Sequence, residues 1–262
     1  MSHLIETDDK IILIPHIPKT AGISVAVSLA NYFDFIYGHS EWPSQKDCSA
    51  LTRRINGHVG VQECQKAIVD FCGDRLKDKE TILISVVRNP WSWWKSWFYF
   101  IPQVAHLDSD FDLEFEEIYK HNNFLWLCLN RDLPHHRDYV FEVFLLWMKE
   151  NRHRCLFGSF HGGNWNSGLP SRKYDQMVDW TNGNVFDFDK SYLCETQEIR
   201  TKIPEFFSEL GFDYDIEITT TNTSRSCEYS NDQIYNEYTR KIVEGFHKED
   251  IKKYGFDWDT HK

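Results

Sequence analysis

The sequence lacks the cysteine patterns of secreted or zinc-binding domains. Its seven cysteines are an odd number, and no two of them are spaced as a C-x-x-C pair. Small disulfide-stapled domains and cysteine-based zinc sites need paired, closely spaced cysteines. We therefore expect reduced thiols in a cytoplasmic protein, without a cysteine-based zinc site.

Long apolar runs and an excess of basic residues are also absent. No stretch approaches the ~20 apolar residues of a membrane-spanning helix. Residues 1–9 carry acidic side chains where a signal peptide would have a basic and then an apolar run. The 29 Lys and Arg residues against 40 Asp and Glu residues give a net charge of −11. This balance argues against binding to nucleic acid or an anionic membrane, although it allows a local basic pocket for a small anion.

What is present suits one sizeable globular domain. The chain has 262 residues, of which 41% are hydrophobic, enough to fill a core. It shows no internal repeat and no low-complexity linker. We therefore expect a single domain over residues 1–262.

Two strand-to-helix junctions indicate the fold class. Residues 11–14 and 81–87 are apolar, β-branched runs typical of strands buried on both faces of a parallel sheet. A small-residue loop and a helix over 24–30 follow the first run, and a helix beginning at Pro90 follows the second. The pattern predicts an α/β fold with a central parallel β-sheet flanked by helices and ligands at the carboxyl ends of the strands.

Periodicity predicts the remaining elements. Helices are expected over residues 61–72, 112–121, 139–149 and 232–254. Short strands are expected at residues 35–37, 177–178, 185–187 and 191–193. Helical spacing places Trp94, Trp97 and Phe98 on one face, which predicts core packing. Three tryptophans in loop-like contexts are candidates for lining a substrate cleft: Trp42, Trp165 and Trp180.

The loop over residues 18–24, Pro-Lys-Thr-Ala-Gly-Ile-Ser, has the parts of an anion cradle. Small residues let backbone N–H groups approach an anion, and the N-terminus of the following helix favours negative charge. It is not a Walker A sequence, G-x-x-x-x-G-K-[ST], because Gly22 is its only glycine and Lys19 precedes the small residues.

Residues 16–24, His-Ile-Pro-Lys-Thr-Ala-Gly-Ile-Ser, resemble the 5′-phosphosulfate loop of sulfotransferases that use 3′-phosphoadenosine 5′-phosphosulfate (PAPS), in the branch that sulfates carbohydrates. The resemblance implies a sulfotransferase fold with a P-loop-like sheet. It also implies cofactor contacts from Lys19, Thr20, Ala21, Gly22, Ile23 and Ser24. The family usually has Thr where this chain has Ile23, so one hydroxyl is missing from the loop.

The second junction resembles the 3′-phosphate segment of the same family, on Val-Arg-Asn-Pro-Trp at residues 87–91 and Ser-Trp-Phe at 96–98. The resemblance implies that Arg88 and Ser96 hold the ribose phosphate, and the planar fork of arginine suits that role. The resemblance to the family extends more weakly over roughly residues 10–258. Arg225 and Ser226 fall where the family has a polar loop near the nucleotide, although an ordinary solvated loop explains them as well.

Sulfuryl transfer to a hydroxyl needs a cation at the leaving oxygen and a base for the acceptor proton. Lys19 is the candidate cation. Gly57-His58-Val59 resembles the catalytic histidine segment of the uronyl 2-O-sulfotransferases, which makes His58 the favoured base. His39 lies in a segment similar to that of the glucosaminyl 6-O-sulfotransferases and is the alternative.

The sequence thus predicts a PAPS-dependent sulfotransferase that acts, without a metal, on a hydroxyl of a carbohydrate or small molecule. Its second product would be adenosine 3′,5′-bisphosphate (PAP). One alternative is a nucleotide-dependent phosphotransferase, since its phosphate cradle would also follow a strand; the missing Walker A spacing and the lack of an obvious acidic pair for Mg²⁺ count against it. The other is a nucleotide-binding module that does no chemistry.

Overall fold

The computed structural model describes residues 2–33, 35–37, 60–107, 139–146, 176–219 and 229–259. The chain divides into two compact units, which we describe separately. The sheet unit comprises Met1–Arg88 and Met177–Asn222, and the helical unit comprises Asn89–Gln176 and Thr223–Lys262. The single domain expected from the sequence stays a prediction.

The sheet unit is built on a mixed five-stranded sheet with the order β3-β1-β2-β4-β5. The strands are β1 (His3–Glu6), β2 (Lys10–Ile14), β3 (Phe35–Tyr37), β4 (Glu80–Val87) and β5 (Lys190–Glu195). Strands β2, β4 and β5 run parallel, whereas β1 is antiparallel to both β2 and β3. The expected parallel arrangement therefore holds for the β2-β4-β5 part of the sheet, and the β1–β2 hairpin makes the whole sheet mixed.

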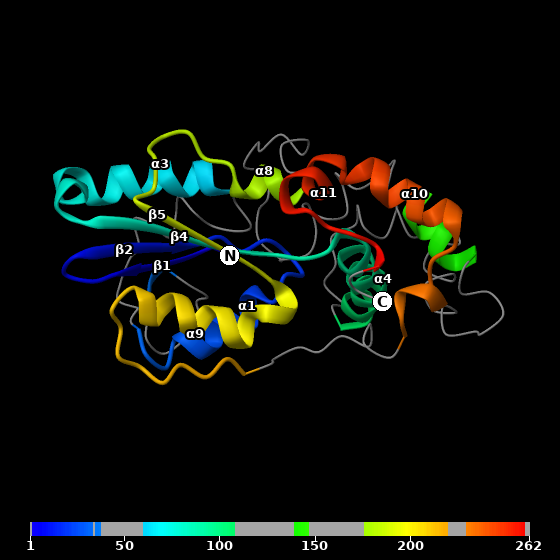
Figure 1. Cartoon of the computed structure of the whole chain (residues 1–262), viewed down its shortest axis with the longest axis horizontal. Coiled ribbons are helices and arrows are strands. Elements are labelled where there is room, and N and C mark those ends of the chain that lie inside the picture. Colours follow the sequence, from blue (N-terminus) through cyan, green and yellow to red (C-terminus); the bar gives the residue numbers. More distant parts are fainter. Residues whose placement is uncertain are drawn as a thin grey trace. The chain divides into compact units, whose positions relative to one another are not determined.

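Helices cover both faces of this sheet (Figure 1). They are α1 (Gly22–Leu29), α3 (Val61–Cys72) and α9 (Ile199–Glu209), with short 3₁₀ turns η1 (Gly73–Asp78) and η2 (Thr196–Glu198). Alternate residues of β2 serve the two faces: Ile12 and Ile14 pack with α1 and α9, and Ile11 and Leu13 pack with α3. The strand is buried on both faces, as its unbroken apolar run predicted. The expected α/β class is confirmed at this level.

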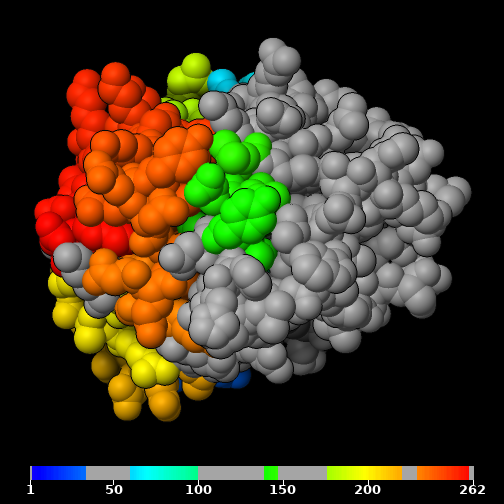
Figure 2. All heavy atoms as spheres, turned by 90° about the vertical axis from the view of Figure 1, so that its right-hand side faces the viewer, coloured from blue at the N-terminus to red at the C-terminus, as the bar shows by residue number. Residues whose placement is uncertain are grey.

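The helical unit is held together by aromatic rings. It contains α4 (Pro90–Leu107), a helix over 139–146, η4 (Asn231–Gln233), α10 (Glu237–Phe246) and α11 (Lys248–Tyr254). The rings of Phe141 and Tyr235 lie 4.6 Å apart, and Figure 2 shows the 139–146 helix (green) beside the segment that begins at residue 229 (orange). Trp94, Trp97 and Phe98 are all at most 3% exposed, which confirms their predicted core role.

Some local predictions were wrong. Residues 177–178 belong to the short helix α8 (Met177–Thr181), and 185–187 form no strand. Trp180 is 1% exposed in α8, so it packs in the core and lines no cleft. The helix expected over 232–254 begins only at Glu237, after a 3₁₀ turn at Asn231–Gln233. It is also interrupted at His247, whose backbone leaves helical geometry while its buried ring bonds to Trp94 and Asp250. The strand expected at 191–193 is confirmed within β5.

Candidate functional site

The carboxyl ends of β2 and β4 bring two basic side chains together. These strands are parallel neighbours, so the segments that follow them leave the same edge of the sheet. Arg88 directly follows β4, and its Nη1 donates a hydrogen bond to the backbone oxygen of Lys19, 2.9 Å away, in the loop after β2. The two segments singled out by the sequence are thus in direct contact.

The loop after β2 has an unusual backbone. Lys19 has a φ of 67° and Ala21 a φ of 63°, so both are left-handed although neither is glycine. Such a conformation costs roughly 1–2 kcal/mol per L-residue. Thr20 between them is not left-handed, and its N–H donates to the Ile17 carbonyl oxygen at 3.4 Å. Loops whose residues alternate in hand are a common way of turning backbone N–H groups toward an anion. Strain of this kind is typical of ligand-binding loops.

Helix α1 presents its N-terminus to the same loop. It begins at Gly22, its N-cap residue Ala21 makes no side-chain cap, and its first turn contains no acidic residue. A helix start without a local carboxylate keeps its partial positive charge for an external anion.

Gly22 is needed for close packing. A Cβ atom at this position would lie 2.6 Å from Cδ2 of His16, which is well inside contact distance. The His16 ring in turn stacks on His3, with ring centroids 5.9 Å apart, and the His16 backbone N–H donates to Oγ of Ser2. His16 therefore supports the loop by packing against Gly22.

The hydroxyls of the loop differ in what they can do. Thr20 is buried, and its Oγ1 donates to the Ile17 carbonyl oxygen at 2.9 Å, so this hydroxyl shapes the turn. Ser24 is also buried, in the first turn of α1, whereas Ile23 is 42% exposed. We therefore expect Thr20 to contribute to anion binding mainly through the backbone that it fixes.

The site carries concentrated positive charge. Burial, and to a smaller extent the nearby charge of Arg88, lower the pKa of Lys19 to about 7. A bound anion would offset both effects, because it replaces lost solvation and screens the two cations from each other. The arrangement is suited to a ligand with at least one negative charge.

A third strand end completes this edge of the sheet. Glu195, the last residue of β5, is in register with Val87 of β4. The next residue, Thr196, donates from Oγ1 to the Val87 carbonyl oxygen at 3.0 Å. The Arg88 N–H donates to Sδ of Met177 at 3.3 Å. These contacts fix the backbone of Arg88 from two sides.

Other residues predicted for the site are not brought together here. Ser96 is 1% exposed in α4 of the helical unit, and its expected pairing with Arg88 stays a prediction. Four more lie outside the described residues: His39, His58, Arg225 and Ser226. Within the described ranges, no group of three or more His, Cys, Asp or Glu residues could hold a metal ion.

The same part of the chain contains no helix with the length and apolar character needed to cross a bilayer. Comparisons of the chain with protein-family models, curated proteins and solved structures found no match.

Proposed function

We propose that this protein binds PAPS and transfers its sulfuryl group to a hydroxyl of a carbohydrate or a small molecule. The observation that carries the proposal is the contact between Arg88 and the left-handed loop of Lys19 at the ends of adjacent parallel strands. PAPS has negative groups at both ends of its ribose, so it needs two cationic contacts. The pair Lys19 and Arg88 provides two such contacts.

Each residue has a distinct task in this proposal. PAPS supplies an activated sulfuryl group: a bond forms between the acceptor oxygen and sulfur, the bond from sulfur to the bridging oxygen breaks, and PAP leaves. Lys19 and the backbone N–H groups of residues 21–23 stabilise the negative charge that develops on the phosphate. Arg88 pairs with the 3′-phosphate. His58 accepts the acceptor's proton, with His39 as the alternative base.

One other enzyme class has support from the same geometry. A left-handed loop in front of a helix N-terminus would also hold the phosphates of a nucleoside triphosphate. A phosphotransferase would, however, require Mg²⁺ for turnover. The two functions are therefore separable by donor and by metal dependence.

The decisive experiment is a transfer assay with the full chain. PAPS carrying radioactive sulfur is incubated with a panel of glycans and hydroxylated metabolites, in EDTA and in Mg²⁺, and a parallel series contains ATP. We expect label in an acceptor with PAPS in both buffers. Turnover only with ATP and Mg²⁺ would establish the phosphotransferase. Binding of PAP without any transfer would indicate a non-catalytic module.

A matched pair of lysine variants ties transfer to the site. Lys19→Ala should abolish transfer, whereas Lys241→Ala should not, because Lys241 is a 66%-exposed side chain paired with Glu237 on α10. Calorimetry adds a test of Arg88: PAP should bind roughly 10- to 100-fold more tightly than adenosine 5′-monophosphate. Arg88→Ala should remove that preference, and equal affinities in the wild type would refute its assignment.

A further inference from the structure

Arg88 is held at both of its ends by other residues of the sheet unit. Its guanidinium donates from Nη1 to the Lys19 carbonyl oxygen at 2.9 Å, and its backbone N–H donates to Sδ of Met177 at 3.3 Å. Met177 is the first residue of α8 and is 1% exposed. The proposed function uses the guanidinium of Arg88 and leaves Met177 without a role.

The contact with Met177 depends on one atom, its sulfur. The register of β4 with β5 ends at Val87 and Glu195, so Arg88 is the first residue beyond the ladder of these two strands. Backbone N–H groups inside proteins need an acceptor, and the thioether supplies one here, although a weak one. Leucine could fill nearly the same volume as Met177 but offers no acceptor. The sulfur is therefore what distinguishes methionine from leucine at this position.

Helix α3 fixes the segment that follows α8. Gln65 of α3 is 1% exposed, and its Nε2 donates to the Phe186 carbonyl oxygen while its Oε1 accepts the Val185 N–H at 3.2 Å. A Cβ atom on Gly183 would overlap Oε1 of Gln65, so the chain lies directly against this amide. These contacts tie the chain around α8 to a helix that packs on the sheet, and they hold Met177 beside the end of β4.

We propose that Met177 is a positioning residue for Arg88, and that its sulfur fixes the backbone from which the guanidinium reaches the 3′-phosphate of the nucleotide. The inference rests on the proposed function, which assigns that phosphate to Arg88. An arginine side chain has many rotamers, and the free energy lost in ordering it on binding is smaller when its backbone is already fixed. Met177 itself touches no part of the ligand in this proposal.

The test compares PAP with adenosine 5′-monophosphate by calorimetry on the full chain. Met177→Leu conserves volume and removes the acceptor. We expect its affinity for PAP to fall about 3- to 10-fold, the worth of one hydrogen bond, while its affinity for adenosine 5′-monophosphate stays nearly unchanged. Equal weakening of both nucleotides would indicate a general effect on the fold and would overturn the proposal. An unchanged affinity for PAP would also overturn it.

A double-mutant cycle separates positioning from general stability. In the Arg88→Ala background, Met177→Leu should cause no further loss of PAP affinity, because the group that it positions is gone. Additive losses would show that Met177 does not act through Arg88. Norleucine, which has a CH₂ group in place of the sulfur, gives the same comparison if Met177→Leu does not fold. The chain has three methionines, and protein containing norleucine at all of them should show the same selective loss of PAP affinity. Full retention of the preference for PAP in that protein would refute the role of the sulfur.

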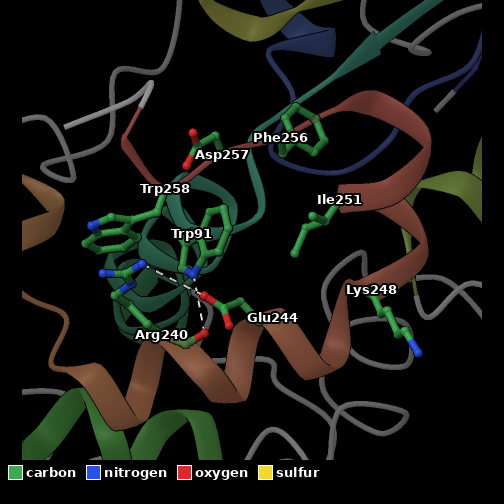
Figure 3. Close-up of a pocket in the computed structure, with 8 residues that line it drawn as sticks. All are labelled: Trp91, Arg240, Glu244, Lys248, Ile251, Phe256, Asp257 and Trp258. Atoms are coloured by element: carbon green, nitrogen blue, oxygen red, sulfur yellow. Dashed lines mark hydrogen bonds and ion pairs between the residues drawn. The ribbon is translucent and has the colours of Figure 1, made fainter.

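Ile251→Leu is the matched control, since it is also an aliphatic exchange that conserves volume. Ile251 belongs to α11 of the helical unit and lines a cavity of about 350 Å³ (Figure 3). None of the residues expected to bind PAPS lines this cavity, so the variant should change the affinity for neither nucleotide. A selective loss of PAP affinity in Ile251→Leu as well would overturn the proposal.

The wild-type protein distinguishes failure of this inference from failure of the proposed function. If the wild type binds PAP no more tightly than adenosine 5′-monophosphate, the assignment of Arg88 is wrong and the role of Met177 falls with it. If the wild type prefers PAP and Met177→Leu keeps that preference in full, only the role of Met177 is refuted.

Discussion

The pKa of Lys19 makes a quantitative prediction about cofactor binding. In the free protein, burial and the neighbouring Arg88 lower this pKa to about 7, so the amine is half neutral near physiological pH. An anion bound against Lys19 favours the charged form and raises its pKa. Binding of PAP above pH 7 must therefore be accompanied by proton uptake.

The size and sign of the pH dependence of PAP binding follow from the lowered pKa of Lys19. As pH falls below 7, Lys19 becomes fully protonated, so the pH dependence of the PAP affinity that Lys19 causes ends there, and only the phosphates of PAP titrate, near pH 6. At pH 8 only about one-tenth of the free protein carries the charged amine, and the affinity should fall up to about tenfold for each further pH unit, or about 1.4 kcal/mol. The affinity for PAP stops falling where the pH reaches the pKa of Lys19 in the complex. Phosphate monoesters are fully charged above pH 7, with a second pKa near 6, so the ligand itself does not distort this window.

Isothermal titration calorimetry measures both quantities. Titrations of PAP at several pH values between 6 and 9 give the affinity, and titrations in two buffers of different ionisation enthalpy give the number of protons taken up. We expect uptake of about 0.9 proton at pH 8. Lys19→Arg keeps its charge throughout this range, so its affinity should be independent of pH and its proton uptake close to zero. Lys241→Arg, on the exposed face of α10, should behave as the wild type.

Two results would refute the reasoning. A wild-type affinity that stays constant from pH 7 to 9 would show that Lys19 is fully charged in the free site. Proton uptake that persists in Lys19→Arg would show that another group is responsible. If the arginine variant binds PAP too weakly to measure, the wild-type proton count still decides between these possibilities.

Three further predictions concern packing and catalysis. Gly22→Ala should lower the free energy of unfolding by about 1–3 kcal/mol in urea titrations, because the new methyl would press into His16; an unchanged midpoint would contradict the close contact. Asp250→Ala should cost about 1–3 kcal/mol in the same assay, since it removes the carboxylate 2.6 Å from Nδ1 of the buried His247, and wild-type stability would argue against this pair. His58→Ala should lower kcat by roughly 10²- to 10⁴-fold in the transfer assay with PAP affinity unchanged, whereas a near-wild-type rate would remove this histidine from the mechanism.

The strands at the centre of the sheet could be predicted because their signal is local. Runs of β-branched residues at 11–14 and 81–87 specify strands buried on two faces, and Pro90 marks the first residue of the helix after the second strand. The hairpin partner β1 was missed, since it is a four-residue strand separated from β2 by a short polar turn. A strand of that length has too few residues for a clear alternation.

The geometry of the candidate site could not be predicted, because it depends on contacts between residues far apart in the sequence. The hydrogen bond from Arg88 to Lys19 requires β2 and β4 to be neighbours in the sheet. The sequence of neither strand specifies which strand lies beside it. The backbone conformation of the loop could not be predicted either, because the left-handed residues are Lys19 and Ala21, while the glycine beside them is helical. Gly22 is there because of the His16 ring, and no local pattern identifies such a partner.

Residues at the start of β1 act on the anion loop through His16. Ser2 and His3 are buried against His16, which in turn fills the space over Gly22 in the anion loop. Substitutions at Ser2 or His3 would therefore alter the support of the anion loop although neither residue belongs to it. Such a variant should lose affinity for an anionic ligand while every residue of the loop itself is unchanged.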